Sequence, residues 1–157
     1  MPESIRAMRE AELSAVARLF TDAVHALAAG HYDVAQRHAW APRSPDLAQW
    51  RERLRGRTVL VAVAESRDLR GFIAYQDDGH IDMLFVAPAA ARSGVATRLC
   101  ACAEAALADA GVSVLRTEAS LVARPFFAQR GFAVVAEEHA VRGGVTLRRF
   151  AMRKALA

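Results

Sequence analysis

Hydrophobic and polar positions along the chain follow two different periods, which predicts an alternation of helices and strands. A short apolar stretch at residues 5–8 is typical of a strand. Apolar residues then recur every three or four positions from Leu13 to Leu27, which predicts a helix with one buried face. Two further helices are predicted at residues 32–40 and 46–54, because prolines between them interrupt the helical pattern.

The middle of the chain changes to a strand pattern. Residues 58–65 are almost continuously apolar and rich in β-branched side chains, as expected of a strand that is buried on both faces. Residues 71–75 and 80–86 flank an Asp-Asp-Gly sequence at 77–79, which is typical of a hairpin turn. These three segments therefore predict neighbouring strands, the last two as an antiparallel pair.

A helix is predicted at residues 94–110, with Gly111 at its end. Four small or apolar residues are predicted to form its buried face: Val95, Leu99, Cys102 and Ala106. Cys100 and Cys102 belong to this helix and lie about 200° apart around its axis, which argues against a disulfide or a shared metal ion. We therefore expect no metal site and a reducing, cytoplasmic environment.

Four shorter elements complete the pattern as a strand, a short helix and a pair of strands: residues 112–119, 125–130, 133–138 and 145–152. The full order predicts a mixed α/β sheet with helices on both faces. A length of 157 residues points to a single domain, which we expect to span residues 1–157. No segment has the pattern of a membrane span or a secretion signal, so we expect neither.

The charge of the chain is positive and comes almost entirely from arginine. Lys154 is the only lysine among 21 basic residues, the net charge is +4 and the pI is near 9.8. A basic pI is one feature of nucleic-acid-binding domains, but GC-rich coding also produces a composition rich in Ala and Arg and free of Asn. Because no dense basic run is present, the charge alone does not favour nucleic-acid binding, which stays an alternative.

The segment from residue 80 to residue 99 carries the strongest chemical signal. A strand runs into a loop of small residues and then into the first turn of a helix, where free backbone amides and the helix dipole favour an anion such as phosphate. Gly94 and Ala96 leave room for close approach, and Arg92 and Arg98 add positive charge nearby. The loop matches neither the P-loop nor the Rossmann glycine pattern, which argues against ATP and NAD.

Two parts of the chain resemble signatures of a known family, the Gcn5-related N-acetyltransferases. Residues 83–88 (MLFVAP) followed by 91–96 (ARSGVA) are similar to the fourth strand and the pyrophosphate loop of that family. Residues 120–132 (SLVARPFFAQRGF) resemble its acyl-CoA motif. The resemblance covers nearly the whole chain, and residues 31–40 and 117–120 are similar to a subgroup of small bacterial members.

The resemblance implies both the fold and the cofactor, acetyl-CoA. The fold is a mixed, mainly antiparallel sheet of six or seven strands that is splayed between strands 4 and 5. The pantetheine arm would follow the backbone of three residues of the fourth strand: Leu84, Phe85 and Val86. The diphosphate would lie on six consecutive backbone amides: Arg92, Ser93, Gly94, Val95, Ala96 and Thr97. The resemblance implies further cofactor contacts for Ser120, Phe127 and Arg130, the last with the 3′-phosphate.

Two positions depart from the pattern of the family. Ala91 stands where the family usually has Gln or Arg, so one side-chain contact to phosphate is missing. Phe127 stands where many members have a tyrosine that protonates the departing thiolate. Since phenylalanine has no proton to donate, water, Ser120 or another hydroxyl does this work, or the thiolate leaves unassisted.

Acetyl transfer to an amine requires a neutral acceptor, so a base is needed to remove the proton of an alkylammonium. Asp82 and Glu118 are equal candidates, followed by His80. Strand alternation places His80 and Asp82 on one face of the fourth strand, and Glu118 lies across the splay. Tyr32 and Trp40 are candidates for the wall of the acceptor pocket, although such a helical stripe is equally typical of a core.

Together these features predict an N-acetyltransferase that moves an acetyl group from acetyl-CoA to an amine of a small molecule or a protein. The amine would attack directly in a ternary complex. Ala91 and Phe127 keep a second hypothesis open, a CoA-binding module or sensor of the same fold without catalysis. We expect no nucleic-acid or membrane partner, and an exposed last strand pair would allow a homodimer.

Overall fold

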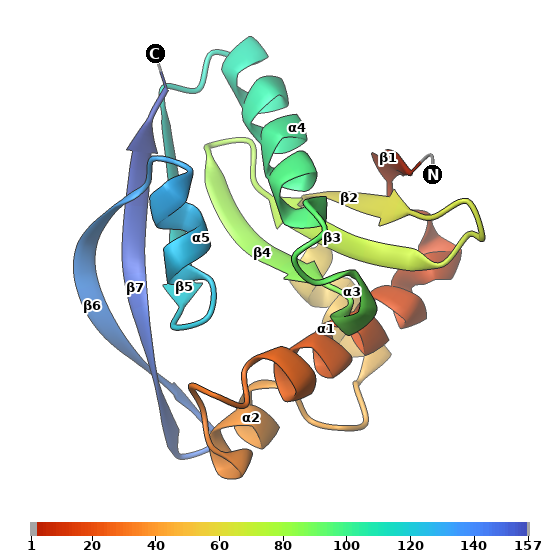
Figure 1. Ribbon diagram of the computed structural model, residues 1–157, viewed down its shortest axis with the longest axis vertical. Helices are drawn as coiled ribbons and strands as arrows, with labels where there is room; N and C mark the ends of the chain where they lie inside the picture. The colour runs from red at the N-terminus through yellow and green to blue at the C-terminus, as the bar shows by residue number, and fades with distance from the viewer. Residues whose placement is uncertain (1–2, 157) are drawn as a thin grey trace.

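The computed structural model describes residues 3–156, and its elements follow the predicted order (Figure 1). Seven strands are present in this range: β1 (Ser4–Ala7), β2 (Thr58–Val63), β3 (Leu69–Tyr75), β4 (His80–Val86), β5 (Val114–Ser120), β6 (Ala133–Arg142) and β7 (Val145–Ala155). Five α-helices and two short 3-10 helices accompany them: α1 (Leu13–Leu27), α2 (Val34–Trp40), α3 (Leu47–Leu54), α4 (Val95–Asp109), α5 (Arg124–Gln129), η1 (Glu10–Glu12) and η2 (Pro88–Ala90). Across residues 3–156, no helix combines the length and the apolar character that a membrane crossing requires.

The strands form one sheet in the order β1-β2-β3-β4-β5-β7-β6, and every neighbouring pair except β4 and β5 is antiparallel. The parallel strands β4 and β5 pair only at His80 with Arg116 and at Ile81 with Thr117. Beyond these two pairs the strands separate, and Figure 1 shows the resulting opening. The predicted mixed sheet with a splay between its fourth and fifth strands is therefore confirmed.

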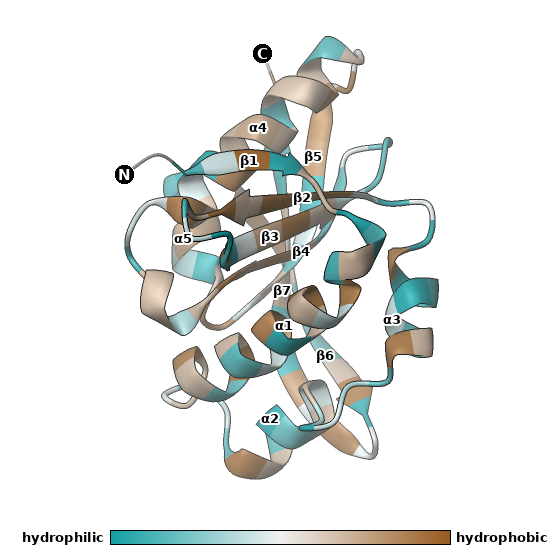
Figure 2. Cartoon of the chain, turned by 90° about the vertical axis from the view of Figure 1, so that its right-hand side faces the viewer, coloured by the Kyte–Doolittle hydropathy of each residue, from teal (hydrophilic) through white to brown (hydrophobic). Residues whose placement is uncertain are grey.

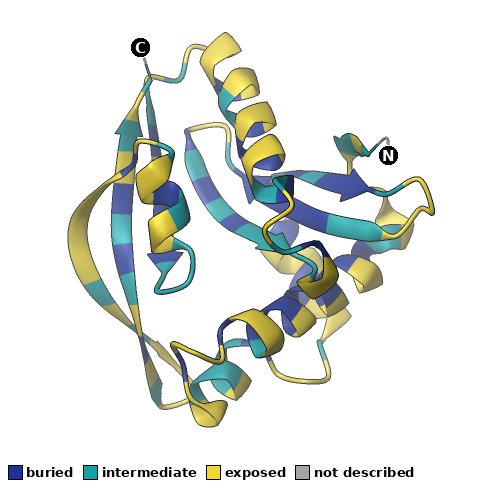
Figure 3. Cartoon of the chain, viewed as in Figure 1, coloured by how far each residue is buried: buried dark blue, intermediate teal, exposed yellow. Residues whose placement is uncertain are grey.

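Helices cover both faces of the sheet, and each face has its own hydrophobic core. Leu99 and Phe127 bring α4 and α5 into the core of one face. Phe20 and Trp50 bring α1 and α3 into the core of the other. Figure 2 shows hydrophobic residues along the central strands, and Figure 3 shows that the same strands are largely buried. Each large apolar side chain buried in this way stabilises the fold by about 1.5–3 kcal/mol, so the two cores fix the positions of β4 and β5.

β4 contains a bulge at Asp82. The register between β3 and β4 changes from Ala74 opposite Met83 to Tyr75 opposite Ile81, which leaves Asp82 as an extra residue. A bulge bends its strand and redirects the neighbouring side chains. Accordingly, Ile81 belongs to the core beneath α4, whereas Met83 belongs to the core beneath α1. The bend coincides with the point where β4 leaves β5.

The buried face of α4 differs from the prediction in its second half. Cys102 and Ala106 are exposed, so their predicted burial is wrong. The residues that α4 buries are Val95, Leu99, Cys100, Ala103 and Leu107. After Leu99 the buried residues follow in steps of four, at Ala103 and Leu107. The predicted face instead continues three residues after Leu99, at Cys102, which lies about 100° away around the helix axis from Ala103. Cys102 and Ala103 are both small and apolar, so their hydrophobicity did not distinguish the two faces, whereas Leu107 beside Ala106 favours the observed one.

Candidate functional site

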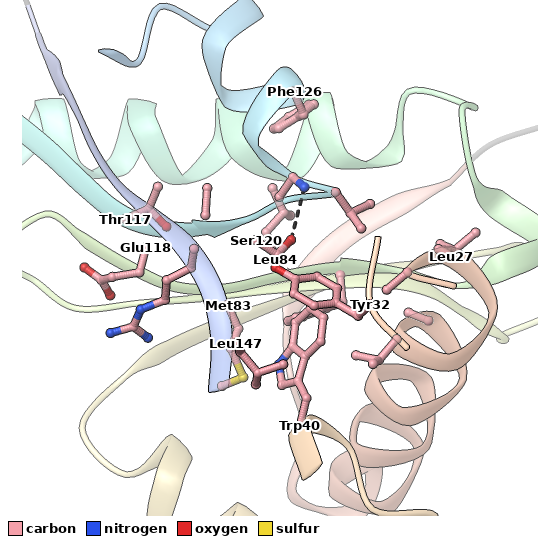
Figure 4. A pocket seen from close by; sticks show the side chains of 18 of the residues that line it. Leu27, Tyr32, Trp40, Met83, Leu84, Thr117, Glu118, Ser120, Phe126 and Leu147 are labelled. Atoms are coloured by element: carbon pink, nitrogen blue, oxygen red, sulfur yellow. Dashed lines mark hydrogen bonds between the residues drawn. The ribbon is translucent and has the colours of Figure 1, made fainter. Parts of the chain in front are cut away.

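A cavity of about 320 Å³ lies in the opening between β4 and β5 (Figure 4). Its wall comes from both halves of the sheet and from all five α-helices of the described residues. The residues that sequence reasoning had selected and that line this wall are Tyr32, Trp40, Asp82, Leu84, Phe85, Val86, Ala96, Glu118, Ser120 and Phe127. The selected residues outside the wall are His80, Arg92, Ser93, Gly94, Val95, Thr97 and Arg130.

The backbone of β4 provides one wall of the cavity. Because β5 pairs with β4 only as far as Ile81, the edge at Leu84, Phe85 and Val86 has no strand partner among residues 3–156. Leu84 and Val86 pack towards the core beneath α4, and Phe85 packs towards the core beneath α1. The edge is therefore held in place from both faces, and it can accept an extended chain of amides as an additional strand.

The loop after β4 leads into the N-terminus of α4. Gly94 is the N-cap residue of this helix and has φ = 85°, a left-handed conformation that residues other than glycine rarely adopt. Arg92 has φ = 61° and shares this conformation. Val95 is buried and anchors the first turn, whereas Thr97 is exposed. A helix start of this kind presents free amides and a positive dipole end, which together favour an anion.

The two arginines of this loop have different surroundings. Arg98 forms an ion pair with Glu3 at 2.7 Å, and Arg70 binds the same carboxylate at 2.9 Å. Ser93 donates a hydrogen bond to the carbonyl of Ala90 and accepts one from Arg70, so it braces the loop. Arg92 is exposed and has no carboxylate partner in the described part of the chain. Of the two loop arginines, Arg92 therefore has the charge that is free to meet a ligand.

Glu118 and His80 form a hydrogen-bonded pair at the base of the opening. Glu118 Oε1 lies 2.7 Å from His80 Nε2, and His80 Nδ1 lies 3.0 Å from Gln76 Oε1. An ionised carboxylate can only accept, so His80 Nε2 carries the hydrogen. The hydrogen bond from His80 lowers the pKa of Glu118 below its ordinary value and outweighs the opposite effect of burial. Glu118 lines the cavity and His80 lies behind it, so Glu118 is the member of the pair that can meet a substrate.

Asp82 reaches the same cavity from β4 and has a different kind of partner. Its Oδ2 lies 3.1 Å from Arg57 Nε. The two candidate carboxylates therefore differ in the group that holds them, which is a guanidinium for Asp82 and an imidazole for Glu118.

Ser120 lies at the end of β5, and its side chain faces the cavity (Figure 4). Its Oγ accepts a hydrogen bond of 3.1 Å from the amide of Ala123, in the turn that leads into α5. Within residues 3–156, its hydroxyl hydrogen has no assigned acceptor. Phe127 lines the same side of the cavity and packs against Phe126 and Phe132. Ser120 is thus the residue of this wall whose hydroxyl hydrogen is free to reach a ligand.

Tyr32 and Trp40 form an aromatic part of the cavity wall (Figure 4). Their ring centroids lie 5.4 Å apart in an edge-to-face arrangement. The Tyr32 hydroxyl donates to the carbonyl of Arg148 at 2.6 Å and accepts from the amide of Leu121 at 2.9 Å. Burial raises the pKa of Tyr32 above its ordinary value. Its proton is therefore engaged and firmly held, and Tyr32 serves as a fixed wall that joins the loop after α1 to β7.

Arg130 lies away from the cavity. Its guanidinium pairs with Glu104 of α4, which also binds Lys154 at 2.6 Å. Arg130 Nε is buried and has no hydrogen-bond partner among the described residues. Contact of Arg130 with a 3′-phosphate stays a prediction, and it would require the guanidinium to be shared with Glu104.

Sequence reasoning missed the basic residues of the wall. Four arginines line it: Arg53, Arg142, Arg148 and Arg149. One comes from α3 and the others from β6 and β7, so no local motif connects them. The two glycines after Arg142 indicated a turn, but they gave no sign of which cavity the turn would border.

Comparisons with known proteins identify relatives over most of the chain. A family model described as "Acetyltransferase (GNAT) domain" matches residues 28–156. The uncharacterized N-acetyltransferase YafP of Escherichia coli (strain K12) is 33% identical over 149 residues, which cover 95% of this chain and 93% of that protein. The crystal structure of a GCN5-related N-acetyltransferase from Rhodopseudomonas palustris has a TM-score of 0.94 at 29% identity and covers 99% of this chain and 97% of its own. PaiA N-acetyltransferase from Thermoplasma acidophilum, solved in complex with coenzyme A, shares the fold with a TM-score of 0.79 at 20% identity, covering 99% and 100% of the two chains.

Proposed function

Because the chain belongs to the GNAT acetyltransferase family, we propose that it transfers an acetyl group from acetyl-CoA to an amine by direct attack in a ternary complex. The observation that carries this proposal is the splay of the sheet. Beyond Ile81 a free strand edge borders a cavity with two carboxylates and continues to the N-terminus of α4. The free strand edge, the two carboxylates and the helix N-terminus that favours an anion therefore lie along one continuous path.

Two features of the site fit acetyl-CoA, and a structure of the same fold supports the assignment. The free edge of β4 matches the amides of a pantetheine arm. The start of α4, with Gly94 and the exposed Arg92, matches a diphosphate. The coenzyme A bound in the PaiA structure supports the same assignment. When bound, acetyl-CoA supplies an acetyl group activated as a thioester.

We assign the role of base to Glu118 and a positioning role to His80. The ammonium form of the acceptor gives one proton to Glu118, and the neutral amine then forms the new C–N bond while the C–S bond breaks. The nitrogen loses a second proton and the departing sulfur gains one, so that the products are an amide and a thiol. Glu118 finally returns its proton to solvent. His80 holds one carboxylate oxygen, which leaves Oε2 to face the amine.

Ser120 is the proposed proton donor to the sulfur, and Ser120→Ala is expected to lower kcat by about 10-fold. The effect is modest for a general acid because a thiol with a pKa near 8.5 is already a fair leaving group. Thr keeps the hydroxyl, so Ser120→Thr should retain most of the activity. Steady-state kinetics at saturating acetyl-CoA test this expectation. An unchanged kcat in Ser120→Ala would assign the proton to water.

Two measurements on the purified protein test the proposed function. Calorimetry is expected to show binding of acetyl-CoA, and a panel of amines is then expected to include acceptors that release free thiol and gain an acetyl mass. Absence of acetyl-CoA binding would refute both the transferase and the non-catalytic CoA-binding module. Binding without thiol release from any amine would favour the module. DNA binding whose affinity falls steeply with salt concentration, and which persists in Gly94→Trp, would support the nucleic-acid alternative.

A further inference from the structure

The charges around the main cavity are not balanced. Six charged residues line it: Arg53, Asp82, Glu118, Arg142, Arg148 and Arg149. Four of the six have an ionic or hydrogen-bonded partner of opposite character: Asp82 with Arg57, Glu118 with His80, Arg148 with Glu137 and Arg149 with Glu138. In the part of the chain that the structure describes, no carboxylate pairs with Arg53 or Arg142. Two cations therefore border the cavity without an anion.

Arg53 lies on the cavity wall beside two aromatic rings. Its guanidinium lies 5.5 Å from the ring centroid of Phe20 and 5.3 Å from that of Trp50, and such contacts favour a cation. The side chain is exposed; partial desolvation lowers the pKa of Arg53, and the charge of Arg142 lowers it further. Asp82 opposes this effect but is already bound to Arg57. An anion delivered by a ligand would therefore meet a guanidinium that no carboxylate holds in the described part of the chain.

Arg142 joins Arg53 at a second cavity. This cavity, of about 290 Å³, lies beside α1 and the segment between α2 and α3, and both arginines border both cavities. The Arg142 guanidinium makes its hydrogen bond to the carbonyl of the preceding residue, Val141, at 3.2 Å. Trp40 also borders both cavities. Arg53, Arg142 and Trp40 thus lie where the two cavities adjoin.

We infer that the acceptor is a small molecule that carries an anionic group, a carboxylate or a phosphonate, in addition to its amine, and that Arg53 and Arg142 bind this anion. The inference rests on the proposed function and specifies its acceptor. The amine faces Glu118, the anion faces the two arginines, and the body of the molecule lies along Tyr32 and Trp40. A guanidinium recognises either anion through two parallel hydrogen bonds.

The location of the arginines favours a small molecule over a protein chain. Arg53 and Arg142 come from α3 and the end of β6, and both border the same two cavities. The same charges disfavour a polyamine, because its second ammonium group would face two cations. An amine that carries a negative charge is thus the class that the cavity fits best.

Matched pairs of amines test the inference. The carboxylate pair is 4-(aminomethyl)benzoate and benzylamine, and the phosphonate pair is 3-aminopropylphosphonate and propylamine. We expect kcat/KM to be at least about 10-fold higher for the anionic member of one or both pairs, the value typical of one charge-assisted hydrogen bond. The pair with the larger ratio identifies the preferred anion. Equal values within both pairs, or faster acetylation of a lysine peptide than of any anionic amine, would overturn the inference.

Variants of the two arginines provide a second test of the inference. Arg53→Gln and Arg142→Gln should each raise KM for the anionic amine by about 10-fold or more and change KM for the neutral amine much less. Arg51→Gln is the matched control, because Arg51 lies on the same helix but pairs with Glu10 at 2.9 Å and borders neither cavity. Equal changes for both members of a pair would mean that the arginines shape the wall without binding an anion.

A binding measurement decides the matter even if none of the four amines is acetylated. The two tryptophans of the chain, Trp40 and Trp50, both border the second cavity. Intrinsic fluorescence should therefore report binding of each amine to the protein saturated with coenzyme A. Tighter binding of the anionic members, lost in Arg53→Gln, would support the inference, and equal binding would overturn it. Failure of coenzyme A itself to bind would instead refute the proposed function.

Discussion

Glu118→Gln is expected to lower kcat/KM for acetyl transfer at pH 7 by about 100-fold or more. Glutamine keeps the length of the side chain and can still accept the hydrogen bond from His80 Nε2, but it cannot take a proton from the acceptor. The loss should shrink as the pH approaches the pKa of the amine, near 10, because the acceptor then arrives neutral. The measurement is the pH profile of kcat/KM for both proteins with the same amine.

Asp82→Asn is the matched control, because Asp82 lines the same cavity and is bound by Arg57. It should lower kcat/KM less than Glu118→Gln and keep the wild-type pH profile. A larger loss in Asp82→Asn, with recovery at high pH, would assign the base to Asp82. Wild-type profiles in both variants would exclude both carboxylates. Calorimetry with acetyl-CoA should give unchanged affinity in each case, which separates a lost base from a lost binding site.

The His80–Glu118 pair determines how stability and activity depend on pH below neutrality. Because the pKa of Glu118 is lowered in the folded protein, the carboxylate is ionised throughout the neutral range and becomes protonated only below its ordinary value of 4.5. The pair therefore contributes stability above that value, and the contribution is lost as the pH falls through the lowered pKa. The kcat of the wild-type protein at saturating amine should therefore persist from neutral pH down to this acidic range, because the Glu118 carboxylate stays ionised and can take the proton of the bound ammonium.

Gly94→Trp is expected to raise the Kd for coenzyme A by about 100-fold or more, the equivalent of losing one or two hydrogen bonds to a charged group. Gly94 has φ = 85°, and a Cβ at this position would lie 2.9 Å from Arg98 Nη1. The indole would cover the first-turn amides of α4, on which the diphosphate is proposed to lie. Isothermal titration calorimetry gives the two dissociation constants directly.

Gly111→Trp provides the control at the other end of the same helix. Gly111 has φ = 87°, and an added Cβ there meets nothing within 4 Å. Both variants should lose a similar stability, about 1–2 kcal/mol for the left-handed conformation, which thermal unfolding can compare. Only Gly94→Trp should lose coenzyme A. If Gly111→Trp weakened binding equally, the diphosphate would not be bound by the loop at Gly94.

The strand, loop and helix start at the proposed cofactor side could be predicted from the sequence because they are local. One continuous segment, residues 80–99, contains the strand edge, the loop and the helix start, so short-range patterns describe their relative positions. The bulge at Asp82 escaped detection, since it depends on pairing with β3. The buried face of α4 was also mistaken, because Cys102 and Ala103 are both apolar and only packing on the sheet distinguishes them.

The acceptor side could not be predicted in the same way, because folding assembles it from distant segments. Tyr32 and Trp40 were selected as aromatics, but the carbonyl of Arg148 that holds the Tyr32 hydroxyl belongs to β7. Arg53 and Arg142 share a wall although α3 and β6 are separated by most of the sheet in sequence. Periodicity describes which face of an element is apolar, and it carries no information about which distant element that face meets.

The position of β7 also sets the order in which a growing chain can build the molecule. β7 is the last strand in sequence, yet it lies between β5 and β6 in the sheet. During synthesis, β5 therefore has no antiparallel neighbour, and Tyr32 has no carbonyl to bind, until residues near 150 have left the ribosome. The strands and helix of the cofactor side come earlier and make local contacts, so they can assemble first. A nascent chain would thus assemble the half proposed to bind coenzyme A before the half proposed to select the acceptor.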